Sequence, residues 1–126
     1  MIISDEKTMR DIQIKFNKKF AYLKLEFYRG QHESGQGSPP SERLDPQLTI
    51  SEVRTVRQEG NLRIKEDMKV SDFEKLFYEK YGLNVQVFRK SGNLWMQTTS
   101  TDSWTLAQQN RKGGSSEHHF KEKYES

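Results

Sequence analysis

The chain has 126 residues, a mass of 14.9 kDa and a formal net charge of +3, which leaves room for one domain of ordinary size. It has no cysteine, which excludes a disulfide scaffold, thiolate catalysis and a zinc ion held by cysteine. No stretch of the sequence approaches the about 20 apolar residues that a membrane-spanning helix needs, so we expect no membrane as a partner.

The first part of the chain changes its hydrophobic period from that of a helix to that of a strand. Between positions 8 and 20 the apolar residues fall on one stripe of a helix: Met9, Ile12, Phe16 and Phe20. Directly afterwards Leu23, Leu25 and Phe27 alternate with polar residues. These two patterns predict a helix over 8–20 and a half-buried strand over 22–29.

The middle of the chain is polar and rich in turn-forming residues. Residues 30–47 hold one large apolar residue, Leu44, and so cannot bury enough surface to offset the entropy of ordering them. We therefore expect a flexible loop there. Beyond it, Thr49 and Glu52 fit a capping box, which predicts a short helix near 50–58. The alternation that follows predicts a short strand over 61–66.

A second helix and strand come next. The stripe of Val70, Phe73, Phe77 and Tyr81 predicts a helix over 69–81. Gly82 is suited to end this helix in a left-handed conformation, and the following alternation predicts a strand over 83–90. A turn-rich link then leads to residues 94–99, which we expect to pair with that strand as a hairpin.

The last helix is predicted from a second capping box. Thr105 and Gln108 occupy the N-cap and N3 positions, and we expect a short helix over 106–112 that Gly113 ends. The remaining residues begin Gly-Gly-Ser-Ser and then alternate in charge. We therefore predict a single domain over 1–112 and a disordered polar tail over 113–126.

The two helix–strand segments resemble each other. The apolar stripe of the helix over 8–20 recurs 61 positions later in the helix over 69–81. The alternation of the first strand recurs 60 positions later in the second strand. We interpret this match, together with the two capping boxes, as an internal duplication of a helix–strand–(variable)–helix unit. The alternative is that any two amphipathic helices followed by strands would match in this way.

The predicted order, α-β-loop-α-β-α-β-β-α, indicates an α+β fold. Helices and strands occur in comparable amounts, and one hairpin is expected. We therefore predict a two-layer sandwich, in which a small, mostly antiparallel sheet carries helices on one face.

Residues that could carry out chemistry are few. The three histidines are His32 in the predicted loop and His118 and His119 in the predicted tail, whereas a general base is usually held by a rigid scaffold. No glycine-rich phosphate loop is followed by a lysine and a helix. We therefore predict no catalytic residue, no cofactor and no metal ligand, and an enzyme is the least favoured class.

Aromatic and basic residues gather on and near the strand positions opposite the apolar stripe. The candidate interaction face consists of Tyr28, Phe88, Arg89, Lys90 and Trp95. An exposed aromatic sheet with basic neighbours is how several domains stack single-stranded RNA, although a net charge of +3 is weak for binding phosphates. Tryptophan and tyrosine also anchor protein interfaces. The plain alternative is that the loop, the short helices or a partner covers these side chains.

We therefore expect a non-catalytic, protein-binding or adaptor domain. Its partner would be another protein or a second copy of the chain, in a homo-oligomer. The alternative is a weakly basic domain that binds single-stranded nucleic acid. The N-terminus turns acidic at Asp5 and has no secretory apolar stretch, so we expect the protein to be cytoplasmic.

Overall fold

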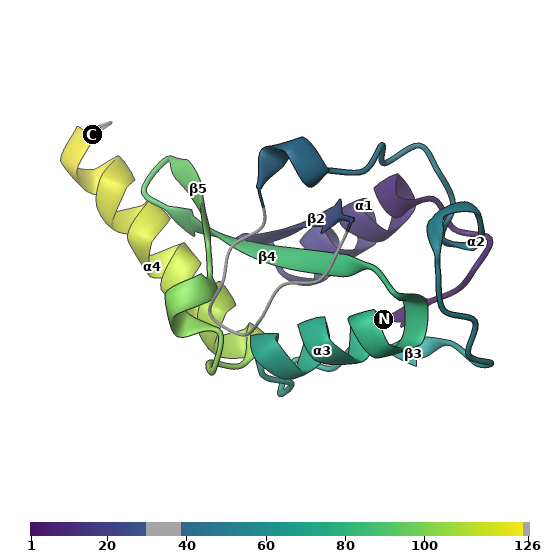
Figure 1. Ribbon diagram of the computed structural model, residues 1–126. Coiled ribbons are helices and arrows are strands. Elements are labelled where there is room, and N and C mark those ends of the chain that lie inside the picture. Colours follow the sequence, from purple (N-terminus) through teal and green to yellow (C-terminus); the bar gives the residue numbers. More distant parts are fainter. Residues whose placement is uncertain (30–38, 125–126) are drawn as a thin grey trace.

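The computed structural model describes residues 1–29 and 39–124, which form an α+β fold (Figure 1). The strands are β1 (Ile2–Ile3), β2 (Leu23–Tyr28), β3 (Leu62–Arg63), β4 (Asn84–Ser91) and β5 (Leu94–Gln97). The α-helices are α1 (Met9–Lys19), α2 (Ile50–Val53), α3 (Val70–Tyr81) and α4 (Leu106–Tyr124). Two short 3-10 helices, η1 (Pro40–Glu42) and η2 (Thr99–Thr101), complete the described part.

The strands form two antiparallel sheets. β4 lies at the centre of a three-stranded sheet in the order β2-β4-β5, and β1 pairs with β3 in a small second sheet. The predicted α+β class, the packing of helices on a small antiparallel sheet and the predicted hairpin are confirmed. The two-residue strand β1 is an addition, because its partners lie about 60 positions away and no local pattern marks it.

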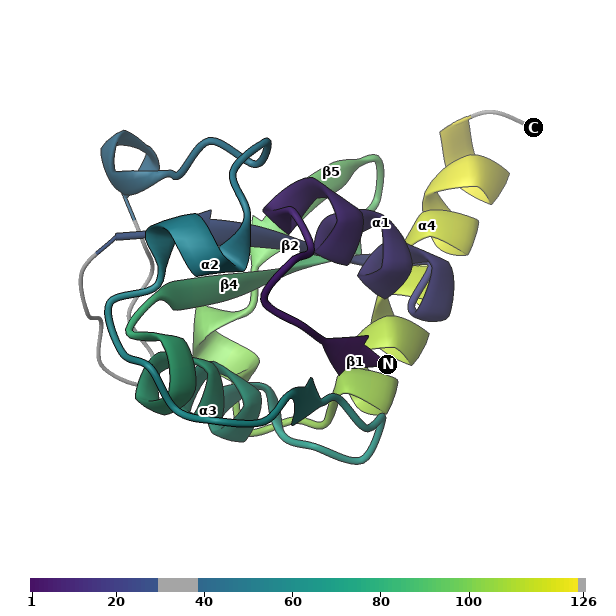
Figure 2. The ribbon, with the colours of Figure 1, turned by 90° about the vertical axis from the view of Figure 1, so that its right-hand side faces the viewer.

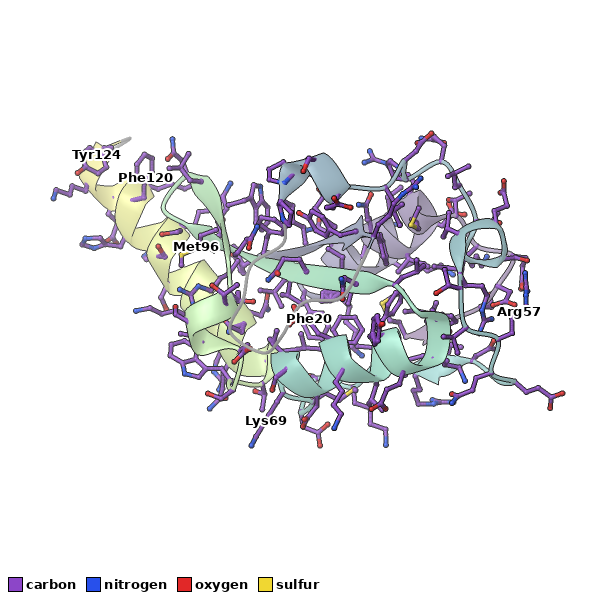
Figure 3. The ribbon with its side chains drawn as sticks, in the orientation of Figure 1. Phe20, Arg57, Lys69, Met96, Phe120 and Tyr124 are labelled. Carbon is purple, nitrogen blue, oxygen red and sulfur yellow. The ribbon has the colours of Figure 1, made fainter. Side chains whose placement is uncertain are left out.

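The core lies between the three-stranded sheet and the predicted helical stripes. The stripes of α1 and α3 and the apolar side of β2 and β4 are buried in one cluster. Aromatic rings join the two helices, since the rings of Phe16 and Phe73 are stacked with their centroids 6.1 Å apart. Figure 3 shows Phe20 in the same interior region, between β4 and α3. The periodicity therefore identifies the buried face of each helix correctly.

Backbone hydrogen bonds at corresponding positions recur in the two parts of the chain that the sequence repeat relates. In the first half, the start of α1 bonds to the residues that precede α2; in the second half, the start of α3 bonds in the same way to the residues that precede α4. The equivalent donor–acceptor pairs are Met9–Leu48 with Val70–Trp104 and Ile50–Lys7 with Leu106–Met68, at N···O distances of 2.9–3.1 Å. We call residues 1–58 and 61–124 the first and second halves.

The pairing of β2 with β4 follows an approximate twofold pattern. β2 and β4 pair antiparallel with Glu26 opposite Gln86, and these two residues are 60 positions apart, the displacement of the strand repeat. Each of these two strands also accepts a backbone hydrogen bond from a segment of its own half on its other side. Leu44 N donates to Phe27 O at 2.8 Å, and Thr98 N donates to Val87 O at 3.2 Å. Each half thus supplies a helix, one strand of the β2–β4 pair, an extended segment beside that strand and a capped helix.

The predicted flexible loop over 30–47 is wrong for its second part. Arg43 forms an isolated bridge to Tyr28 at the edge of β2, and Leu44 is only 6% exposed. Backbone bonding to β2 orders this segment despite its composition, because the strand edge offers unpaired donors and acceptors. Residues 30–38 lie outside the described part of the chain.

The capped helices also differ from the prediction in length. The capping boxes form at both predicted sites, but α2 ends at Val53, because Arg54 adopts an extended backbone. The last helix, α4, does not end at Gly113 and continues to Tyr124. The helix therefore crosses the boundary at 112 that we predicted between domain and tail.

Close packing against Tyr22 explains why α4 runs through two glycines. A Cβ atom on Gly113 would lie 2.8 Å from Tyr22 Cβ and 3.1 Å from Tyr22 O, and one on Gly114 would lie 2.9 Å from the tyrosine ring. Further along α4, Ser116 Oγ accepts a hydrogen bond from Gly92 N at 2.8 Å. The two glycines allow α4 to pack closely against the domain, and they do not end the helix.

Replacing Gly113 with alanine should destabilise the protein by about 1–2 kcal/mol. The added methyl group meets the Tyr22 backbone, which cannot rotate away, and this overpacking outweighs the gain in helix propensity of about 1 kcal/mol. Urea unfolding of both variants measures the difference. Ser115→Ala is the matched control, because Ser115 is exposed on the same helix and should change stability by less than about 0.5 kcal/mol. Unchanged stability in Gly113→Ala would contradict the close contact.

The described part of the chain contains no helix that is both long enough and apolar enough to cross a bilayer.

Candidate interaction face

The candidate residues divide between the two faces of the sheet. Residues that are directly opposite in neighbouring strands share a face, so the pairs Lys24–Phe88 and Lys90–Trp95 lie on the outer face, away from α1 and α3. Tyr28 belongs to the same face by alternation along β2. Arg89 pairs with Leu23 and therefore lies on the opposite, core-facing side.

The prediction that Arg89 belongs to the interaction face is wrong. Arg89 is 7% exposed, and its Nη1 donates to Gln109 Oε1 of α4 at 2.8 Å. The guanidinium also lies 5.5 Å from the centroid of the Trp104 ring. The alternation of side chains along β4 could have identified this placement, because Arg89 follows Val85 and Val87 at alternate positions, and these valines face the core.

The burial of Arg89 has an electrostatic consequence. Within residues 1–29 and 39–124, no carboxylate lies within ion-pair distance of its guanidinium, and Arg89 Nε has no hydrogen-bond partner. Removal from water lowers the pKa of Arg89 below its usual value. The neutral side-chain amide of Gln109 and the aromatic ring of Trp104 stabilise the positive charge of Arg89 in part.

Two of the predicted aromatic side chains are covered. Tyr28 is 0% and Phe88 9% exposed, so neither forms the open hydrophobic surface that we expected. Part of the contact with Tyr28 comes from the predicted loop over 30–47, as that alternative expected. Arg43, in the segment after η1, donates from Nη2 to Tyr28 Oη at 3.5 Å, with its guanidinium 5.9 Å from the ring centroid. This hydrogen bond raises the pKa of Arg43.

A smaller aromatic and basic site remains around Trp95. Lys24 Nζ lies 5.3 Å from the centroids of both the Trp95 and Phe88 rings, and Lys90 Nζ lies 5.0 Å from that of Trp95. Lys24 also faces Glu26, with Nζ and Oε1 3.9 Å apart. We call Lys24, Lys90 and Trp95 the Trp95 site. Lys24 was missed from the sequence, because its pairing with β4 is a long-range contact.

The Trp95 site lies on an edge strand. β5 is the last strand in the order β2-β4-β5. Hydrogen bonds alternate along an antiparallel ladder, and Thr98 N points toward Val87 of β4. The N–H and C=O groups of Trp95 therefore point away from β4. Its neighbour Leu94 is 67% exposed, so an apolar side chain and outward-pointing backbone groups occur together at this edge.

The side of β5 opposite Trp95 faces α4. Figure 3 shows Met96 on this side, and Phe120 and Tyr124 further along the helix toward its end. The rings of Phe120 and Tyr124 lie 4.9 Å apart, and Tyr124 is 65% exposed. In the described part of the chain, no group of three or more histidine, cysteine, aspartate or glutamate residues is placed to hold a metal ion.

Comparison with known proteins gives no family assignment. No protein-family model matches the chain, and neither the curated proteins nor the solved structures contain a significant match to it.

Proposed function

We propose that this protein is a non-catalytic binding domain that pairs an extended segment of a protein partner with β5 and anchors it on Trp95. The observation that carries the proposal is the coincidence of three features at one edge: outward backbone groups at Trp95, the exposed Leu94, and the two lysines beside the indole. An unpaired edge strand is a template for strand addition. Tryptophan is a frequent anchor of protein interfaces.

The charges at the site favour an acidic partner segment. Lys24 and Lys90 place two ammonium groups around one indole ring, and only Lys24 has an ion pair, with Glu26, among the described residues. A carboxylate beside Trp95 in the partner would interact favourably with both ammonium groups. We therefore expect the partner segment to be extended, with an acidic residue next to an apolar one.

Burial weakens the nucleic-acid alternative. A single-strand-binding sheet stacks two or three bases on exposed aromatic rings. Here the rings of Tyr28 and Phe88 are covered, and Trp95 alone remains among the predicted stacking residues. We expect only weak, salt-dependent binding of oligonucleotides, of the kind that a mildly basic surface produces.

Replacing Trp95 with alanine should weaken partner binding by about 2 kcal/mol or more, as for an interface anchor. The partner is first captured in cells that naturally produce the protein, by crosslinking to a photoreactive residue that replaces Leu94. The affinity of the captured partner is then measured for the wild-type protein and for Trp95→Ala. Ile14→Ala is the control, because Ile14 is 44% exposed on a different element, α1. Equal affinity of wild type and Trp95→Ala would contradict the proposal.

A titration with labelled single-stranded oligonucleotides tests the alternative directly. Micromolar binding that weakens with salt and disappears in Trp95→Ala would assign the site to nucleic acid and overturn the proposed function. Binding that follows the salt concentration but ignores Trp95 is the result that we expect.

A further inference from the structure

We propose that a second copy of this chain can supply either half of the domain, so that two copies exchange halves and form a dimer. In this dimer, the first half of each copy packs against the second half of its partner. The exchange occurs through residues 57–61, which we call the hinge. It is independent of what the Trp95 site binds.

The hydrogen bonds within each half are separate from those that join the halves. The backbone bonds that hold α1 to the segment before α2, and α3 to the segment before α4, stay inside one half. The β2–β4 ladder, in contrast, joins the halves over its whole length, from the pair Leu23–Arg89 to the pair Tyr28–Asn84. β1 and β3 also pair across the halves. A half from a second copy can therefore form the same ladders while the bonds inside each half stay intact.

The apolar contact between the halves is of the kind that holds two subunits together. Phe27 of the first half and Phe77 of the second have ring centroids 5.5 Å apart, and those of Phe16 and Phe73 are 6.1 Å apart. All four side chains are buried. A contact surface that resembles a domain core is typical of obligate homodimers. The approximate twofold pattern of the β2–β4 pair also resembles the symmetric contact of two identical subunits.

The hinge is held by few interactions. All five of its residues are exposed, and in the described part of the chain they make no backbone–backbone hydrogen bond with another element. Lys80 Nζ donates to Glu59 O at 2.9 Å, and Arg54 Nη2 donates to Gln58 O at 3.2 Å. Figure 2 shows the chain passing from α2 along α3 to the strand beside β1. Opening the hinge therefore breaks few contacts.

Gly60 gives the hinge a conformation that other residues disfavour. Its φ is 87°, in the left-handed region that favours glycine. An added Cβ would meet nothing closer than Lys80 Nζ at 3.8 Å, so a side chain has room and only the backbone conformation opposes it. A β-branched residue prefers an extended backbone. Because we expect the hinge to be extended between the two domains of the dimer, such a residue at position 60 favours exchange.

Exchange also changes which chain completes the Trp95 site. Lys24 belongs to the first half, whereas Lys90 and Trp95 belong to the second. In the dimer, the Lys24 ammonium group that lies 5.3 Å from the indole centroid therefore comes from the partner copy. Each dimer has two such sites, and two linked sites bind a bivalent partner with avidity.

Refolding from urea at about millimolar protein, followed by size-exclusion chromatography with light scattering, measures the exchange. We expect a minor dimer fraction for the wild-type chain and about ten times as much for Gly60→Val, because only the dimer relieves the disfavoured φ. Gly92→Val is the matched control. Gly92 also has a positive φ, of 63°, but it lies in the turn between β4 and β5, inside the second half. Gly92→Val should lower stability without forming the dimer.

A disulfide distinguishes exchange from association through the surface. The chain has no cysteine, and Ile2 of β1 lies directly opposite Arg63 of β3, so Ile2→Cys combined with Arg63→Cys places two thiols within bonding reach. In the exchanged dimer this bond joins two chains, which stay linked in denaturing, non-reducing electrophoresis. In a monomer, or in two copies that associate through their surfaces, the bond forms within each chain.

The dimer of the otherwise wild-type chain is analysed in the same way, which keeps the test independent of whether Gly60→Val folds. Interchain disulfides in the dimer, together with more dimer for Gly60→Val than for Gly92→Val, are the expected results. Three results would overturn the inference. They are no dimer for either the wild-type chain or Gly60→Val, a dimer whose disulfides lie within each chain, or equal dimer fractions for Gly60→Val and Gly92→Val.

Discussion

Replacing Phe77 with alanine is expected to lower the free energy of unfolding by about 3–5 kcal/mol. Phe77 is 0% exposed, and its ring links both halves of the core. The ring centroid lies 5.5 Å from that of Phe27 on β2 and 4.8 Å from that of Tyr81. The truncation removes these contacts and leaves a cavity that the surrounding strands and helices cannot fill.

Urea unfolding followed by circular dichroism measures this loss. Leu76→Ala is the matched control, because Leu76 precedes Phe77 on α3 but is 41% exposed, and it should cost less than about 1 kcal/mol. The account of the core would be contradicted if the two substitutions destabilised the protein equally.

Arg54→Ala is expected to cost about 2–4 kcal/mol. The Arg54 side chain is 3% exposed and pairs with Asp5. Its guanidinium also donates to the backbone oxygens of Val56, Gln58 and Lys80, at 2.8, 3.2 and 3.0 Å. The arginine therefore joins the segment after α2 to the end of α3, and its removal leaves three carbonyl groups without their partner.

The control for this prediction is Arg57→Ala. Arg57 is exposed and makes one backbone hydrogen bond, to Ser51 O at 3.3 Å, so its loss should change stability by less than about 0.5 kcal/mol. Asp5→Asn separates the contributions, because it keeps the carbonyl contacts of Arg54 and removes the charge of its partner. A smaller effect for Asp5→Asn than for Arg54→Ala is expected, since Asp5 is 44% exposed.

The parts of the fold that follow local rules could be predicted from the sequence. The stripe that ends in Phe77 and Tyr81 identified α3, and Gly82 ends this helix with φ of 70° as expected. The capping box at Thr49 formed because its donors and acceptors lie within four residues. Local periodicity and capping require no knowledge of the rest of the molecule.

The parts that depend on distant contacts could not be predicted. Gly113 is typical of a helix end, yet it lies within α4 because Tyr22 packs against it. The segment around Leu44 is ordered by the edge of β2, which lies beyond a segment of low apolar content. The composition of a segment indicates how much surface the segment can bury by itself. These two segments are ordered by packing and hydrogen bonds with other elements, which composition does not show.

The candidate site was predicted in part for the same reason. Tyr28 and Phe88 do lie on the outer face with Trp95, as alternation along the strands indicates. Both rings are contacted by residues outside their own strand, Tyr28 by Arg43 and Phe88 by Lys24. Strand periodicity assigns a side chain to a face, but exposure depends on what the chain later places over that face.

Residue-resolved amide hydrogen exchange on β5 tests the central claim, that this edge pairs with a partner strand. In the free protein, Trp95 N–H should exchange much faster than Met96 N–H, because Met96 pairs with Arg89 of β4 and Trp95 points outward. Addition of the captured partner should then slow exchange at Trp95. Slow exchange at Trp95 in the free protein, or exchange there that the partner leaves unchanged, would contradict the account.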